Sequence, residues 1–120
     1  MATATNFAEN QILDALLVNG NIFLALFTTA PTEAGGGTEV VGGGYARQLC
    51  DMDPASGGSK PNTDPIQFTN MPAVTVTHWA LYDVVSGGNM LVYGALTAPQ
   101  LFTAGQPCDV AAGAVVVTCD

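Results

Sequence analysis

The segment VTVTHWALYDVVSGGNMLVYGAL, residues 74–96, carries the strongest indication of the fold. Apolar and polar residues alternate at the start of Val74–Tyr82, and Gly87–Gly88 separates this run from a second apolar run, Met90–Leu96. Alternation with a period of two is typical of a half-buried strand, and glycines between two such runs predict a turn. The segment therefore predicts an antiparallel hairpin with one strand in each run.

Further short apolar runs, separated by glycine-rich breaks, continue this pattern along the chain. Ile22–Thr28 is apolar on both faces, so we expect a central strand that is covered on each side. Shorter strands are expected at Tyr45–Cys50, Ile66–Thr69, Gln100–Thr103 and Ala114–Thr118. This number of strands predicts a mainly β fold, either an antiparallel β-sandwich or a partly open barrel.

One amphipathic helix is expected before the strands, from about Phe7 to Val18. Asn6 is a suitable N-cap, Glu9 follows three residues later as in a capping box and is expected to face water, and Gly20 supplies the stop. The apolar face consists of Phe7, Ile12, Leu13, Leu16 and Leu17. We expect this face to pack on the sheet of its own subunit or, as an alternative, in a subunit interface. The sequence does not distinguish the two, because an amphipathic helix has the same apolar face in both cases.

The length of 120 residues fits one domain with a single hydrophobic core. We expect a flexible N-terminal arm at residues 1–5 and one β-rich domain at residues 6–120, with long loops at 30–44 and 51–65. The second loop is rich in Pro, Gly, Ser and Asn and is not expected to pack by itself.

Charge limits the partners that the chain can bind. Charged residues make up 10% of the chain, against about 25% in a typical soluble domain, and ten acids against two cations give a net charge of −8. Nucleic acid and anionic membranes are therefore not expected as partners, because both require clustered Lys and Arg. No apolar run approaches the roughly 20 residues of a membrane span, and no signal peptide is visible, so folding in a cytoplasm is expected. A surface with so little charge favours association with other proteins.

Residues for catalysis or metal binding are scarce. The chain has one histidine, His78, and three cysteines that are far apart and form no C-x-x-C pair. We therefore expect no enzyme activity, no cofactor and no metal, and we expect His78 to be structural. The cysteines are expected to be free and mostly buried. Cys108 and Cys119 would face each other if the C-terminal segment formed a hairpin.

Arg47 is the only arginine and lies in an otherwise apolar segment, which favours a partly buried ion pair. That pair is expected either within the subunit or across an interface, with Glu33, Glu39 or Asp51 as its partner. Trp79, the only tryptophan, is expected in the core or, as the minority alternative, as an interface anchor. The candidate interface residues are Phe7, Leu13, Tyr45, Arg47 and Trp79.

Six segments of the sequence identify a protein family more specifically in combination than any single glycine-rich segment does. They are Leu24–Thr28, Gly37–Val40, Gly43–Arg47, Val76–Asp83, Ser86–Leu91 and Tyr93–Leu96. Together they resemble a family of small structural proteins of tailed bacteriophages, over most of the chain from Phe7 to Asp120. Members are labelled head decoration (cement) proteins or tail fibre proteins. The resemblance implies a part of the virion and brings no catalytic residues with it.

The absence of any repeat or heptad favours the cement interpretation over a fibre. We expect a homotrimer at three-fold positions that binds the major capsid protein on the outer surface of the head and stabilises the mature shell. The acidic balance favours the outer surface, because the interior faces the phosphates of packaged DNA. The alternative is a tail or tail-fibre-associated module that binds host-surface glycan through the glycine-rich loops, with Trp79, Tyr45 or Tyr93 as stacking rings.

Overall fold

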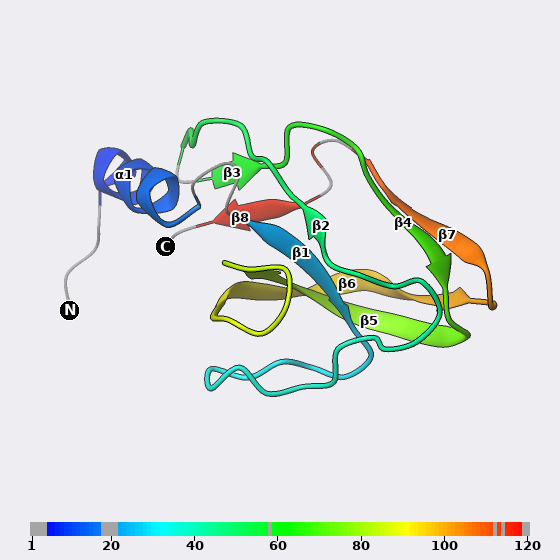
Figure 1. Ribbon diagram of the computed structural model, residues 1–120. Helices are drawn as coiled ribbons and strands as arrows, with labels where there is room; N and C mark the ends of the chain where they lie inside the picture. Colours follow the sequence, from blue (N-terminus) through cyan, green and yellow to red (C-terminus); the bar gives the residue numbers. More distant parts are fainter. Residues whose placement is uncertain (1–4, 18–21, 58, 112, 114, 119–120) are drawn as a thin grey trace.

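Eight strands and one helix make up the part of the chain that the computed structural model describes, residues 5–17, 22–57, 59–111, 113 and 115–118. In chain order they are α1 (Asn6–Leu16), β1 (Phe23–Phe27), β2 (Gln48–Leu49), β3 (Ser59–Pro61), β4 (Ile66–Met71), β5 (Val74–Tyr82), β6 (Met90–Phe102), β7 (Gln106–Val110) and β8 (Val116–Thr118). One layer is an antiparallel sheet in the order β2-β1-β5-β6, and the other holds the pairs β3–β8 and β4–β7 (Figure 1). The predicted β-sandwich is confirmed, and the sheets do not close into a barrel.

The hairpin of β5 and β6 is the longest pairing in the fold, as the sequence predicts. β5 has the predicted bounds, and Gly87 and Gly88 take the positive φ angles of 70° and 74° that the turn needs. β6 is longer than expected because the predicted strand at Gln100–Thr103 is its continuation. The register shifts on the way: Val76 lies opposite Gln100, but His78 lies opposite Ala95, so β6 has extra residues between them.

β1 is the central strand that its two apolar faces predict. It pairs with β2 on one side and β5 on the other, and four of its five residues are buried. Leu24 and Leu26 belong to the main core between the layers, whereas Ala25 and Phe27 belong to a smaller cluster that also contains Ala80. Both faces of β1 are therefore covered, which is why its sequence does not alternate.

The pairing of the C-terminal strands differs from the expectation. β7 lies between the two strands predicted at Gln100–Thr103 and Ala114–Thr118, where the sequence predicts no strand, because Gly105, Gln106 and Pro107 are typical of a turn. β7 pairs with β4, and β8 pairs with β3, so Cys108 does not lie in a C-terminal hairpin. Cys119 lies outside the described residues. Cys50 is a buried free thiol and Cys108 a partly buried one, in agreement with the expectation for both.

The segment 51–65, expected to be an unpacked loop, is part of the fold. It contains β3, and Met52 forms a bridge with Asn62. Asn62 is only 1% exposed; its amide nitrogen donates to the carbonyls of Asp64 and Ala111, and its amide oxygen accepts from the N–H of Val115. A buried amide with satisfied hydrogen bonds is tolerated in a core, so a segment of polar composition packs here.

The helix begins one residue earlier than expected. Thr5 is the N-cap, and its hydroxyl accepts from the N–H of Ala8 at 3.2 Å. Asn6 as N-cap is therefore wrong, and Thr5 belongs to the helix cap rather than to a flexible arm. Glu9, expected in water, is buried. Residues 1–4 and the predicted stop at Gly20 lie outside the described residues.

Only part of the apolar face of α1 packs on its own subunit. Leu13 is 2% exposed and Leu17 is also buried in the core, whereas Phe7 is 74% exposed and Ile12 and Leu16 are exposed as well. An ion pair attaches the helix to β3: Lys60, which is only 4% exposed, donates from Nζ to Asp14 Oδ1 at 2.8 Å. The N–H of Ala55 donates to the same oxygen at 3.0 Å.

Removal of the Asp14 charge is expected to weaken this attachment and to reduce the acid sensitivity of the fold. The pKa of Asp14 lies below its usual value of 3.8, mainly because of the hydrogen bond from Lys60 and then because of the one from Ala55. A carboxyl with a lowered pKa stabilises the folded state fully above its unfolded pKa, and this contribution is lost as the pH falls through the lowered value. Asp14→Asn is therefore expected to lower the urea midpoint at neutral pH and to flatten the decline of stability in acid.

Urea titrations followed by circular dichroism at several pH values test this expectation. Asp64→Asn is the matched control, because Asp64 is also an exposed carboxylate but lies outside this ion pair. Identical stability profiles for the wild type and Asp14→Asn would contradict the assignment of Asp14.

Candidate functional site

Arg47 lies at the centre of a polar network that joins loops distant in sequence. Its Nε and Nη2 donate to the two carboxylate oxygens of Glu39 at 2.9 and 2.8 Å. Its Nη1 donates to the carbonyls of Val84 and Gly87 at 3.1 and 2.8 Å. The side chain is almost fully buried within the subunit. The ion pair within the subunit, one of the two alternatives from the sequence, is therefore the one observed, with Glu39 as the partner.

Aromatic rings surround this ion pair. The guanidinium of Arg47 lies 3.6 Å from the centroid of the Tyr82 ring, and Tyr82 stacks on Phe27 with the ring centroids 6.4 Å apart. A cation over an aromatic face is attracted to its negative centre, most strongly where water is excluded. Arg47 thereby fixes the β5–β6 turn and the loop around Glu39 on the face of the sheet that carries Phe27.

Tyr45 completes the edge of β1. Along this edge β1 pairs with β2 at Phe23 and Leu24 and forms a bridge from Phe27 to Glu39. The N–H of Leu26 lies between these pairings and donates to the hydroxyl of Tyr45 at 3.0 Å. That hydroxyl in turn donates to Glu39 Oε2 at 2.7 Å. Burial raises the pKa of Tyr45, so the hydroxyl is protonated at neutral pH and can act as this donor. Interface roles for Tyr45 and Arg47 stay predictions.

Tyr45→Phe is expected to destabilise the fold by about 1–3 kcal/mol, because it leaves the N–H of Leu26 without its acceptor. Urea unfolding at neutral pH measures the change. Tyr93→Phe is the matched control: the Tyr93 hydroxyl makes only a long, exposed contact of 3.4 Å with Glu33, so a change within about 0.5 kcal/mol is expected. Equal stabilities of the two variants would contradict the role given to Tyr45.

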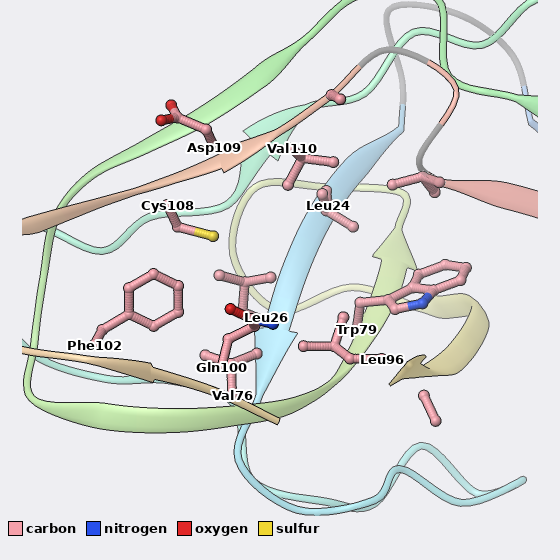
Figure 2. Close-up of a pocket in the computed structure, with 13 residues that line it drawn as sticks. Leu24, Leu26, Val76, Trp79, Leu96, Gln100, Phe102, Cys108, Asp109 and Val110 are labelled. Atoms are coloured by element: carbon pink, nitrogen blue, oxygen red, sulfur yellow. The ribbon is translucent and has the colours of Figure 1, made fainter. Parts of the chain in front are cut away.

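Trp79 lines a pocket between the two layers of the sandwich. The pocket has a volume of about 410 Å³, and Figure 2 shows it between β7 and β6, with Leu24 and Leu26 of β1 behind. Trp79 is partly buried and packs against the main core, as the core interpretation predicts, and its alternative role as an interface anchor stays a prediction. It lies directly opposite Gly94 on β6. A side chain at Gly94 would meet the indole, since a Cβ there would lie 2.8 Å from Trp79 Cζ2.

The chemistry of this pocket suits an apolar group. Of the described residues that line it, only Gln100, Cys108 and Asp109 are polar. The carboxylate of Asp109 points away from the pocket in Figure 2 and accepts from Gln67 Nε2 at 2.8 Å. Burial raises the pKa of the Cys108 thiol, so it stays protonated at neutral pH and is a poor nucleophile. The described lining of the pocket therefore suits an apolar side chain or ligand group.

The remaining candidates do not gather around this pocket. Phe7 is exposed on α1, and Leu13 packs inside the core. Tyr93 pairs with Ala80, the neighbour of Trp79, so Tyr93 and Trp79 lie on opposite faces of the sheet. Tyr45 stacks on Phe68, with the ring centroids 5.7 Å apart. The three rings considered for glycan stacking therefore form no common platform.

Metal-binding clusters and membrane-spanning helices are both missing from the described ranges. No three His, Cys, Asp or Glu side chains in them are placed to hold a metal ion. Within the same residues, no helix is long and apolar enough to cross a bilayer.

Gly94→Ala is expected to displace the indole of Trp79 and so to shift its fluorescence emission, because the added methyl occupies the place of the ring. Trp79 is the only tryptophan, so the emission reports this position alone. Gly36→Ala is the matched control, since Gly36 is exposed and a Cβ there meets only Thr32. An unchanged spectrum for Gly94→Ala at full folding would contradict the packing of Trp79 on Gly94.

Comparison with known proteins yields one family. No curated protein shows significant similarity to the chain. A family model described as "Podophage GP4 fiber I protein gp80" matches residues 3–118, which include almost the whole sandwich. This match supports a fibre-related structural protein, which the sequence had suggested only as the alternative to a capsid cement protein. The chain belongs to this podophage fiber I protein family and is a structural component of a phage virion.

Proposed function

We propose that the chain is a structural module of a fibre on the podophage particle and acts by binding other proteins, without catalysis. The observation that carries the proposal is the family match over residues 3–118. The cement interpretation receives no support from this match. Its expected partners, the major capsid protein and two further copies in a homotrimer, were inferred from a position at the three-fold sites of a capsid, and they stay predictions.

The reactive groups support a role in binding. His78 is engaged with its neighbour, since Nδ1 lies 2.8 Å from the hydroxyl of Thr77. Burial raises the pKa of the Cys50 thiol to about 12 and also raises that of Cys108. At neutral pH both groups are therefore protonated thiols, and thiols in this form do not attack substrates.

The charges support protein partners rather than nucleic acid. The chain has two cationic side chains, and both are used in ion pairs: Arg47 with Glu39, and Lys60 with Asp14. No further lysine or arginine is available for phosphate groups, although phosphate contacts by Lys and Arg supply most of the affinity for nucleic acid. The net charge of −8 favours a position outside the DNA-filled interior.

The surface supports docking. Phe7, Ile12 and Leu16 on α1 are exposed, as is Leu101 near the end of β6. Figure 1 places α1 and this end of β6 at opposite ends of the molecule. Exposed apolar side chains at both ends suit a module that contacts neighbours on two sides.

The copy number of the chain in purified virions tests the proposal. A fibre attached at a few positions is expected to give far fewer copies than the major capsid protein, by quantitative mass spectrometry. Labelling of intact virions with a gold-conjugated antibody against the chain is expected to mark a fibre attachment site. A ratio near one copy per major capsid protein, with label over the whole head, would overturn the fibre proposal in favour of a cement protein.

A further inference from the structure

The sandwich has an open side between β6 and β7. The two strands are consecutive and are joined by the turn at Thr103–Gln106, yet among the described strands β6 pairs only with β5 and β7 only with β4. Each is therefore the last strand of its layer on this side (Figure 1). Over the described residues no strand pairs with the outer edge of either, so both edges present unpaired backbone groups.

The two edges differ in their protection against strand addition. Natural edge strands are protected by prolines and charges, because these disfavour pairing with another chain. β7 carries Pro107 and Asp109 among its five residues. The first half of β6, Met90–Ala95, has neither a proline nor a charge, and Val92–Ala95 is in continuous register with β5. Of the two edges, β6 is the one suited to accept a further strand.

The apolar pocket lies directly beside this edge. Ala95 and Leu96 of β6 line it, together with Trp79 and with Val110 of β7. Its volume of about 410 Å³ falls in the range of roughly 300–1,000 Å³ that is typical of ligand sites. When a peptide adds to a sheet edge, backbone hydrogen bonds supply affinity, and pockets for alternate side chains supply specificity. The combination of edge and pocket therefore fits an extended segment with one apolar side chain in the pocket.

The charged residues near the β6 edge indicate the charge that the bound segment should carry. Glu33 lies on one side, where its carboxylate contacts the Tyr93 hydroxyl, and Asp109 lies on the other, on β7, where its exposed carboxylate points away from the pocket and accepts from Gln67. Both cations of the chain are engaged elsewhere, with Glu39 and Asp14. A basic segment is therefore complementary, whereas a second copy of this chain brings a net charge of −8.

We propose that the open side of the sandwich, formed by the β6 edge and the adjoining pocket, binds an extended segment of another protein. That segment places one large apolar side chain against Trp79 and carries lysine or arginine residues near Glu33 and Asp109. The chemistry of the segment follows from the structure alone. Only its assignment to another virion protein rests on the proposed function.

A synthetic peptide, acetyl-Lys-Lys-Thr-Leu-Thr-Lys-Lys-amide, tests the proposal with the full chain. Because Trp79 lines the pocket and is the only tryptophan, binding is expected to produce a saturable change in its fluorescence. Replacement of the central leucine by aspartate is expected to weaken binding at least about tenfold, and replacement of both threonines by proline likewise, because proline lacks the N–H donor. Absence of a saturable change up to about 1 mM peptide would overturn the proposal.

Variants of the chain locate the binding to the edge. Ala95→Lys places a cation on the exposed edge beside the pocket and is expected to weaken peptide binding at least about tenfold. Thr75→Lys is the matched control, with the same charge change at an exposed residue of β5 that lines no part of the pocket. Thermal unfolding verifies that both variants are folded. Equal binding by Ala95→Lys and the wild type would overturn the proposal.

Analytical sedimentation of the wild-type chain tests whether a second copy of the chain, rather than another protein, binds the β6 edge. The chain alone is expected to remain free of pairing through β6. A dimer that Ala95→Lys dissociates and that the peptide does not dissociate would assign the edge to a second copy and overturn the proposal. The virion copy number is measured independently, so failure of peptide binding and failure of the fibre proposal are distinguishable.

Discussion

The ion pair between Glu39 and Arg47 is the interaction on which the arrangement of the loops depends. Glu39 comes from the long glycine-rich loop at residues 30–44, which has little apolar surface of its own, and Arg47 comes from the segment that follows this loop. The network nevertheless holds this segment against β1 through Tyr45 and against the β5–β6 turn through the carbonyls of Val84 and Gly87. A buried ion pair is favourable only when its remaining donors and acceptors are satisfied. Here the backbone carbonyls and the tyrosine hydroxyl meet that condition.

Features carried by local pattern were predictable from the sequence. The β5–β6 hairpin, the central strand β1 and the helix depend on residues close in sequence, so alternation, apolar runs and capping residues were sufficient. The error at the start of the helix has the same origin: Thr5 and Asn6 are both good N-caps, and only the hydrogen bond to Ala8 distinguishes them. β7 was missed because Gln106 and Pro107 resemble a turn, and its partner β4 is distant in the chain.

The candidate site was predictable only in part, for the same reason. Arg47 was notable as a lone cation in an apolar segment, which indicated an ion pair but left its partner open. The pocket at Trp79 depends on the register that places Gly94 opposite the indole and on the divergence of β6 from β7. Neither feature has a signal in local sequence. The absence of repeats favoured a capsid cement protein, but a compact sandwich is equally suitable as one module of a fibre.

Asn62 has a consequence for a particle that is subjected to force. Its side chain and backbone bind the C-terminal segment at Val115 and Gly113, and β3, which immediately precedes it, pairs with β8. Tension applied through the C-terminal strand therefore reaches β3 and, through Lys60 and Asp14, the helix, before it loads the central sheet. The antiparallel bonds of β3–β8 and the contacts of Asn62 therefore bear this tension ahead of the sheet of β1, β5 and β6.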